Sequence, residues 1–554
     1  MKKLPALLWV LKRVRRRIPA LLLLTAAGAG SAFLGVLFAL GTRQVIDCAV
    51  SGGRDPFLRA CVQQGAIILG ILLCITLSRH LTERLRAELD RDWKRDLLHG
   101  LLHGDYAAVS RYHSGELINR LNNDVRTVDE GLLSALPGVV SMVTRLLTAM
   151  AALLAMQPVF TAALFAAGAL VVVVTGLMRR KLKELHKTVS EHDGKVSGFL
   201  QEILEKLLMV QAMDVSAEME KRAEELMESR YEVQRRCKNA ALFANTGVSV
   251  MAYGASFVAL VWCAGGLLRG TMSFGSLTAV TQLVSQLQSP FVGLSGVIPQ
   301  YIAMTAAAER LMELEAIEGE PEPGAESAQA LYDRMDAIRG DGLTFAYDRD
   351  RVLEGASFSL PKGGFTAVTG PSGTGKSTLL KLLLGIFRPE SGRLYLDCGG
   401  EAVPLDRSTR RLFAYVPQGN LLLSGTLREN LTVAKPDATE AELAQAIHVS
   451  AMDEFLPLLP QGLDTVLGES GAGLSEGQAQ RLAIARAVLG GAPVLLLDES
   501  TSALDARTER IVLERLRAMP GRSCIAVTHR SAALELCGRK LEIDGGKIRV
   551  REIE

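Results

Sequence analysis

Three short segments in the C-terminal half carry residue types that bind and cleave a nucleoside triphosphate. Gly370–Thr378 reads GPSGTGKST, Val494–Ser500 reads VLLLDES and Leu474–Gln478 reads LSEGQ. In the first, closely spaced glycines let backbone N–H groups approach a phosphate at the start of a helix. The apolar run Gly364–Gly370 predicts a strand before this loop and residues 376–384 predict a helix after it, which is the context that a phosphate-binding loop requires.

The residue types within these segments assign a chemical role to each position. Lys376 reaches the β- and γ-phosphate oxygens, and the Ser377 hydroxyl is a Mg²⁺ ligand. Asp498 ends an apolar run typical of a buried parallel strand and holds Mg²⁺ directly or through water, and Glu499 polarises the attacking water. We therefore predict ATP and Mg²⁺ as cofactors, bound by Gly370, Ser372, Gly373, Thr374, Gly375, Lys376, Ser377 and Thr378.

The N-terminal half is apolar enough to cross a membrane repeatedly. The chain has 554 residues, of which 48% are hydrophobic, and its mean hydropathy of +0.21 is high for a soluble protein. Stretches of about 20 apolar residues span a bilayer. Such stretches lie near 18–41, 59–78, 132–156, 158–178, 241–268 and 277–301. The predicted fold is an α-helical six-span transmembrane domain (1–315), a linker rich in Glu, Pro, Gly and Ala (316–334), and an α/β P-loop NTPase domain (335–554).

Basic residues predict how these spans are oriented. Clusters precede the first span (Lys12, Arg13, Arg15, Arg16, Arg17), follow the second (from Arg79 to Arg95) and follow the fourth (Arg179, Arg180, Lys181, Lys183). By the positive-inside rule, the N-terminus, both long loops and the NTPase domain are cytosolic, and the plasma membrane is the default residence. The loops at 79–130 and 179–240 have the apolar spacing of helical hairpins. A net charge of +2 gives no general basic field, so nucleic acid is not a predicted partner.

The order of the motifs resembles one family. LSEGQ, continued by QRLAIARAVL, is similar to the signature of the ATP-binding cassette (ABC) superfamily, and nearly the whole chain resembles an exporter-type half-transporter. The resemblance implies that Tyr347 stacks on adenine and that Gln418 lies between Mg²⁺ and the membrane domain. It also implies that Glu469 is a coupling glutamate, that Asp505 belongs to the D-loop (SALD, 502–505) and that His529 is a catalytic switch residue beside the γ-phosphate.

The same resemblance implies a dimer. Each ATP would lie between one phosphate loop and Ser475, Gly477 and Gln478 of a second half-transporter, in a homodimer or a heterodimer. The second hairpin, with its tip near Met209–Ser216, would cross to the opposite ATP-binding domain. Glu476 departs from the family's usual glycine. A carboxylate about 8 Å from a γ-phosphate repels it by about 0.5–2 kcal/mol, and this effect vanishes if the side chain points to solvent. We therefore interpret Glu476 as a tolerated variant.

The transported substrate is less well defined by the sequence. Arg145 falls near the middle of a predicted span. It either lines a cavity for a polar or anionic substrate, or pairs with a helix dipole or backbone carbonyls, or the span is displaced from its predicted position. Gln282 and Gln286 share a polar stripe that either lines a pathway or joins helices of two protomers. The function predicted is ATP-driven export of an amphipathic small molecule, lipid or peptide. The alternatives are an importer built on the exporter fold and an ATP-gated channel or regulatory membrane ATPase.

Overall fold

The computed structural model describes residues 3–553, with the exception of 323, 325, 348–349, 420–421 and 469–472. The chain forms two compact units. The first consists of Met1–His99 and Ser114–Ala316, and the second of Gly100–His113 and Ile317–Glu554.

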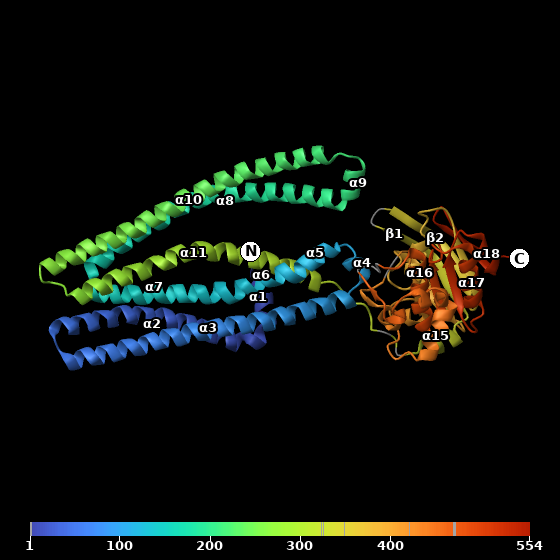
Figure 1. The fold of residues 1–554 in the computed structure, drawn as a ribbon, viewed down its shortest axis with the longest axis horizontal. Helices are drawn as coiled ribbons and strands as arrows, with labels where there is room; N and C mark the ends of the chain where they lie inside the picture. Colours follow the sequence, from blue (N-terminus) through green and yellow to red (C-terminus); the bar gives the residue numbers. More distant parts are fainter. Residues whose placement is uncertain are drawn as a thin grey trace. The chain divides into compact units, whose positions relative to one another are not determined.

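The first unit is built from long helices (Figure 1). The helices are α1 (Lys3–Arg13), α2 (Ile18–Ser51), α3 (Arg54–His103), α5 (Ser114–Asn119), α6 (Val125–Glu130), α7 (Leu136–Met156), α8 (Pro158–Glu205), α9 (Leu207–Ala212), α10 (Ser216–Leu268) and α11 (Phe274–Glu315). Figure 1 shows α8 and α10 as a long antiparallel pair that α9 joins at one end, while α11 packs against α2 and α7. Residues 179–240 are therefore a helical hairpin, as their apolar spacing predicts.

Helical segments long and apolar enough to span a membrane coincide with much of the predicted set. Among residues whose side chains are described, these are Arg15–Ser51, Arg54–His103, Ser114–Met156 and Ser249–Leu268. They contain the spans predicted near 18–41, 59–78 and 132–156 and most of the one near 241–268. The spans predicted near 158–178 and 277–301 fall on α8 and α11, where the side chains of 166–183 and of most residues from 289 to 298 lie outside the described set.

Two kinds of contact hold α11 in the first unit. Near its start, Leu283 and Val284 are fully buried with Leu153 of α7 and Val36 of α2 in an apolar core. Near its end, Arg310 makes a two-bond ion pair with Asp124, at 2.8 and 2.5 Å. Asp124 is buried in the π-helical segment η2 (Arg120–Asp124), and the guanidinium of Arg310 supplies both of its carboxylate oxygens with a donor.

The second unit is an α/β domain with two main sheets. The larger sheet has the order β12-β11-β3-β10-β9-β6, in which all strands but β12 run parallel. Its strands are β3 (Gly364–Thr369), β6 (Phe413–Val416), β9 (Val494–Asp498), β10 (Ser523–Val527), β11 (Arg539–Asp544) and β12 (Lys547–Glu552). The smaller antiparallel sheet comprises β1 (Ala337–Tyr347), β2 (Asp350–Pro361), β4 (Ser391–Cys398) and β5 (Glu401–Pro404). A short pair, β7 (Gly425–Thr426) and β8 (Val466–Leu467), is separate.

Both faces of the parallel sheet are buried, which explains the unbroken apolar run of β9. Val494 and Leu496 face a core that includes α13 (Lys376–Leu383) and the smaller sheet. Leu495 and Leu497 face the other core. That core contains residues of α14 (Leu427–Thr432), α15 (Glu440–Val449), α16 (Glu476–Leu489) and α17 (Ala506–Arg517). Alternate residues of a strand point to opposite faces, so a strand covered on both sides must be apolar throughout.

The tip of the first hairpin belongs to the second unit. It carries α4 (Tyr106–Val109), capped by Asp105, whose backbone N–H donates to the carbonyl of Glu318 at 2.9 Å. The ring of Tyr106 meets that of Phe387 edge-on, with 5.9 Å between centroids. The end of α3 is thereby fixed to the α/β domain of the same chain.

We expect Asp124→Ala to destabilise the helical unit by about 1–3 kcal/mol, because it removes the partner of Arg310 and a buried hydrogen-bonded charge. Thermal unfolding of the purified protein in detergent measures the change. The matched control is Glu83→Ala, which breaks an exposed pair with Arg86 within α3 and is expected to cost less than about 0.5 kcal/mol. Equal shifts of the unfolding temperature in the two variants would contradict a stabilising role for the Arg310–Asp124 ion pair.

Candidate nucleotide-binding and hydrolysis site

The carboxyl ends of four parallel strands bring the predicted ATP-site residues to one edge of the sheet. Val527 of β10 pairs with Val368 of β3 on one side and with Asp498 of β9 on the other. Val416 of β6 pairs with Leu497 of β9. The segments that leave these strands carry Lys376, His529, Glu499 and Gln418, so residues up to 153 positions apart in the chain follow adjacent strands.

The phosphate loop adopts a backbone that its glycines permit. Gly370, Gly373 and Gly375 have φ of 148°, 80° and 95°, in the region that favours glycine. A Cβ on Gly375 would come within 2.1 Å of Val352 Cγ1. Lys376 is 6% exposed, and its ammonium donates to the carbonyls of Gly370 and Pro371 at 2.9 and 2.8 Å. The ammonium therefore lies inside the curve of the loop, at the place its predicted phosphate-binding role requires.

Two oxygens suited to Mg²⁺ are in contact behind the loop. Ser377 Oγ donates to Asp498 Oδ1 at 2.9 Å, and the hydroxyl of Tyr415 donates to Asp498 Oδ2 at 3.0 Å. Burial raises the pKa of Asp498, and the two hydroxyl donors oppose that shift. A hydroxyl beside one carboxylate fits Mg²⁺, which takes one or two protein carboxylates and fills its other positions with phosphate and water. The described residues contain no cluster of three or more His, Cys, Asp or Glu side chains that would hold a metal without phosphate.

Glu499 is held in a strained conformation beside Gln418. Its φ is +48°, which side-chain-bearing residues rarely adopt, and its backbone N–H donates to the carbonyl of Val527 at 3.2 Å. Gln418 Nε2 donates to Glu499 Oε2 at 2.8 Å. The strand pairing thus turns the carboxylate of Glu499 away from buried Asp498 and against the exposed amide of Gln418. His529 is exposed two residues after the end of β10.

Tyr347 and Thr378 join the smaller sheet to the phosphate loop. Thr378 Oγ1 donates to the Tyr347 hydroxyl at 3.3 Å. The Tyr347 side chain is 39% exposed, and its ring makes perpendicular contacts with Phe345 and Phe387 at 5.0 and 5.3 Å. A tyrosine supported at its edges and partly exposed suits stacking on a base. Ser372 and Thr374 lie in the loop itself, where Thr374 Oγ1 donates to the carbonyl of Pro371 at 2.9 Å.

The signature segment forms the start of α16 and touches the D-loop. Ser475 caps the helix in a capping box: its backbone N–H donates to Gln478 Oε1 at 2.9 Å, and its side chain accepts from the backbone N–H of Gln478. A Cβ on Gly477 would lie 3.0 Å from the carbonyl oxygen of Ala503, so a larger residue here would press on the D-loop. Glu476 is exposed in the first turn, where the helix dipole favours a negative charge. Among the described residues, no hydrogen bond joins Ser475, Gly477 or Gln478 to the phosphate loop of their own chain.

Asp505 has a clear structural position. It caps α17, accepting bonds from the backbone N–H groups of Arg507 and Thr508 at 3.1 and 3.0 Å. These bonds, the one from Thr508 foremost, lower the pKa of Asp505. Glu469, the predicted coupling glutamate, lies outside the described residues.

Three residues with no role in the sequence analysis complete the site. Tyr415 is the second hydroxyl on Asp498. Arg530 donates to the carbonyls of Leu504 and Ser502 at 2.7 and 2.5 Å and to Glu509 at 3.0 Å, and Glu509 is 1% exposed. These bonds hold in place the D-loop, the segment of the chain that runs from Glu499 to Asp505. The sequence offered one weak signal, the position of Arg530 directly after His529.

The predicted pathway residues are spread over two helices of the first unit. Gln286 of α11 donates to the carbonyl of Gly35 in α2 at 2.8 Å, so it joins two helices of one protomer. Gln282 of α11 and Arg145 of α7 are half-buried. Gln288 of α11, which the sequence analysis did not single out, bonds to Ala252 and Ser256 of α10. A role in substrate contact stays a prediction for Arg145, Gln282 and Gln286.

Fold and site together define a P-loop ATPase fused to a helical membrane domain. Residues 21–291 match the ABC transporter transmembrane region, and residues 353–502 match the ABC transporter family. The chain belongs to the ABC transporter family. It is a membrane protein and an ATP-hydrolysing transporter, and the predicted fold class is confirmed.

Similar proteins of known name differ in the direction of transport. The chain is 33% identical over 437 residues to the mycobactin import ATP-binding/permease protein IrtB of Mycolicibacterium smegmatis, covering 76% of this chain and 75% of that protein. The match to IrtB of Mycobacterium tuberculosis is 37% over 277 residues, only 48% of that protein. The ATP-dependent lipid A-core flippase of Chromobacterium violaceum is 31% identical over 444 residues, covering 79% of this chain and 75% of that protein.

A solved structure supports the fold. The structure of a bacterial Atm1-family ABC exporter with ATP bound superposes with a TM-score of 0.79. The superposition covers 97% of this chain and 95% of that one, at 24% sequence identity. At this identity the likeness concerns the fold alone.

We expect Arg530→Met to lower the maximal ATPase rate by about tenfold or more, because small displacements of a catalytic segment have effects of this size, while leaving the KM for ATP within about twofold. Arg530→Lys, which keeps the charge, should retain part of the rate. The control is Arg510→Met, which removes an exposed cation of α17 paired with Glu535. A wild-type rate in Arg530→Met would contradict a positioning role for Arg530.

Proposed function

We propose that two copies of this chain form a homodimer that exports an amphipathic small molecule, lipid or peptide from the cytoplasm, driven by ATP. Residues 1–315 are the membrane domain and residues 335–554 the ATP-binding domain, with the N-terminus and the ATP-binding domain on the cytoplasmic side of the plasma membrane. The observation that carries the proposal is the pairing of Gln418 with strained Glu499 directly beside the Ser377–Asp498 contact. This arrangement puts a water-polarising carboxylate next to a phosphate-binding loop.

In this proposal the residues of one chain prepare ATP for hydrolysis. Lys376 and the loop N–H groups bind the β- and γ-phosphates, and Tyr347 stacks on the base. Ser377, Asp498 and Gln418 would hold Mg²⁺, which would neutralise charge on the phosphates. Glu499 takes a hydrogen bond from the attacking water, and His529 lies beside the γ-phosphate. The strain at Glu499 supports the proposal, because strained residues persist where the surrounding structure fixes them for a function.

The second chain completes each site. Ser475, Gly477 and Gln478 lie at the N-terminus of α16, where N–H groups favour an anion, and they make no described hydrogen bond to their own phosphate loop. A partner's ATP is the anion that this end would bind. Because Glu476 is exposed there, its carboxylate is well screened by solvent, and we expect the variant signature to function.

The tip of the second hairpin also favours a dimer. Around α9, large apolar side chains are exposed: Leu204, Leu207, Leu208, Met209 and Met213 are between 44% and 81% exposed. Isolated exposed leucines are common, but a cluster at the end of a long hairpin indicates a partner surface. In the proposed dimer this tip contacts the ATP-binding domain of the second chain. The tip of the first hairpin packs on the ATP-binding domain of its own chain.

Import is the second candidate for the direction of transport. It is favoured by the relative from Mycolicibacterium smegmatis, whose name describes mycobactin import. A heterodimer is equally compatible with the site, since each half would still supply one phosphate loop and one signature.

We predict that inside-out vesicles containing the wild-type protein accumulate substrate from a mixed metabolite and lipid extract with ATP, and that Glu499→Gln abolishes the accumulation. The control is Glu514→Gln, an exposed carboxylate of α17. Accumulation in right-side-out vesicles with ATP inside would show import instead. ATPase activity without accumulation in either orientation would favour a gated channel or regulatory ATPase.

We also predict that Leu208→Glu uncouples ATP hydrolysis from transport, since charging a leucine that packs on a partner removes a contact of about 1.5–3 kcal/mol. Transport should fall by about tenfold or more, with basal ATPase activity within about twofold of wild type. Met227→Glu, on the shaft of α10 and 43% exposed, is the control. Unchanged transport in Leu208→Glu would contradict a role for this tip.

A further inference from the structure

Asp129 of the first unit is a buried carboxyl group for which the structure provides no hydrogen-bond donor. It is 1% exposed, and neither of its Oδ atoms has a partner among the described residues. The buried Nε1 of Trp93, which faces Asp129 from α3, and the buried Nε of Arg86 are also without a partner there. Buried polar groups in proteins are almost always hydrogen-bonded, so neighbouring exceptions indicate a function other than stability.

The helix that carries Asp129 has irregular ends. This helix, α6, lies between two π-helical segments, η2 and η3 (Gly131–Ala135). π-helical turns are rare and occur frequently at functional sites. At η3 the chain comes close to α11, since a Cβ on Gly131 would lie 2.6 Å from the Cβ of Met304. A displacement of α6 is therefore passed on to α11.

Asp129 lies outside the apolar spans, at the level of charged residues of α3. Arg86, Asp90 and Lys94 act on it electrostatically from that helix, and they lie 8 to 16 positions beyond the end of the span predicted near 59–78. The cations on the elements packed around Asp129 each pair with another carboxylate. These pairs are Arg86 with Glu83, Lys94 with Asp90, Arg126 with Glu130 and Arg310 with Asp124.

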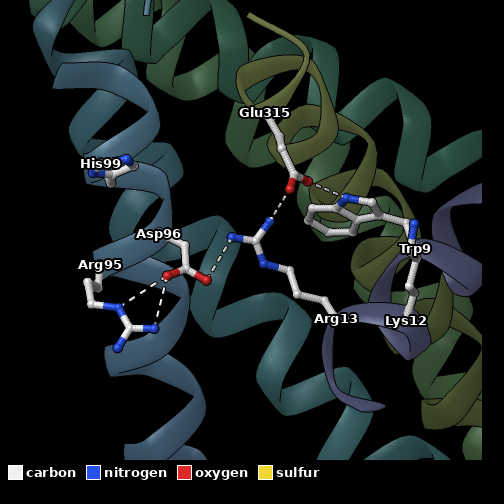
Figure 2. Close-up of a pocket in the computed structure, with 7 residues that line it drawn as sticks. All are labelled: Trp9, Lys12, Arg13, Arg95, Asp96, His99 and Glu315. Carbon is white, nitrogen blue, oxygen red and sulfur yellow. Dashed lines mark hydrogen bonds and ion pairs between the residues drawn. The ribbon is translucent and has the colours of Figure 1, made fainter. Parts of the chain in front are cut away.

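Trp93 is fixed from its other side. Its ring centroid lies 5.1 Å from that of Trp9 in α1, and the guanidinium of Arg13 lies 5.6 and 5.0 Å from the centroids of Trp9 and Trp93. Trp9 donates to Glu315 of α11, and Arg13 donates to the same carboxylate at 2.6 Å (Figure 2). A ring stacked and bonded in this way has little freedom to turn. Trp93 therefore does not supply Asp129 with a donor.

A buried carboxyl group without a donor favours its neutral form. Burial raises the pKa of Asp129 to about 8, and the like charge of Asp90 adds to this effect, whereas Trp93, Arg86 and Lys94 oppose it. In a hydrated conformation the pKa would return to its ordinary value of 3.8. Between these two values, each rise of one pH unit favours the hydrated conformation by about tenfold, so the buried conformation is the more stable one at low pH.

We propose that Asp129 is a proton-binding site that keeps α3 packed against α6. With its proton the carboxyl group stays buried between the two helices. When the proton passes to water, the carboxylate becomes hydrated and the packing of α3 against α6 loosens. The contact of Gly131 with Met304 carries this change to α11, so that pH biases the conformation of the first unit. This inference depends on neither the direction of transport nor the substrate.

Tryptophan fluorescence of the full-length protein in detergent tests the proposal. Of the three tryptophans in the chain, a Trp262→Phe background keeps Trp9 and Trp93, the stacked pair beside Asp129. In this background we expect one fluorescence transition between about pH 6 and 8. Quenching by acrylamide should increase through the same transition, because Trp93, which is 2% exposed, becomes accessible. Asp129→Asn, which has the shape of the protonated group and cannot ionise, should abolish both changes.

Variants of the neighbouring charges should move the midpoint in opposite directions. Asp90→Asn removes a like charge and should lower the midpoint, whereas Lys94→Gln removes a cation and should raise it, each by about half a pH unit or more. The control is His99→Gln, because His99 is a second titratable group near Trp9, at the edge of the cavity in Figure 2. It should leave the transition in place.

Any of four results would overturn the proposal. A transition that persists in Asp129→Asn, or that is lost in His99→Gln, would assign the titration to another group. Unchanged midpoints in both Asp90→Asn and Lys94→Gln would place the titrating group away from α3. The absence of a transition between about pH 5 and 9 would show that Asp129 keeps one protonation state over this range. A transition without a change in acrylamide quenching would show that losing the proton does not loosen the packing.

Discussion

The burial of Asp498 at the carboxyl edge of the parallel sheet constrains most of the ATP site. A carboxylate with 1% exposure needs donors, and it takes them from Ser377 after β3 and from Tyr415 in β6. One side chain thereby ties β9 to both the phosphate loop and the strand that precedes Gln418. The next residue, Glu499, leaves the strand in a left-handed conformation, in which its backbone N–H donates to Val527 of the neighbouring strand.

A second set of bonds connects this edge to the surface proposed to meet a partner. From Glu499 the chain passes into the D-loop, which Arg530 and buried Glu509 hold from one side. Gln480 of α16 holds it from the other side, donating to Ser502 and accepting from the backbone N–H of Ala503. Gly477 packs directly on Ala503. A shift of Glu499 is therefore transmitted to the N-terminus of α16 through closely packed groups that have little room to absorb it.

The motifs in the sequence predicted those site residues whose positions follow from the ends of the parallel strands. Lys376, Glu499 and His529 each follow a parallel strand at a short distance and Asp498 ends one, so their motifs sufficed to place them at one edge of the sheet. Tyr415 and Arg530 could not be found in this way, because their partners are set by which strands become neighbours and by side-chain direction. Hydropathy found α2, α3 and α7, but it could not tell that Gln286 bonds to Gly35 of a neighbouring helix. Polar stripes on a helix look alike whether they face a pathway or a backbone carbonyl.

The aromatic cluster of the second unit links the tip of the first hairpin to Tyr347, the residue proposed to stack on adenine. Phe387 contacts Tyr106 in the hairpin tip at 5.9 Å and Tyr347, the proposed adenine-stacking residue, at 5.3 Å. One ring thus touches both Tyr347 and the short helix α4, which follows α3 in the chain. Because the contacts are edge-on and the core around Phe387 is close-packed, Tyr347 cannot move far without displacing Tyr106. The tip of the second hairpin exposes Leu208. Each ATP-binding domain would then act on one hairpin within its chain and one from its partner, and closure of the dimer would move both together.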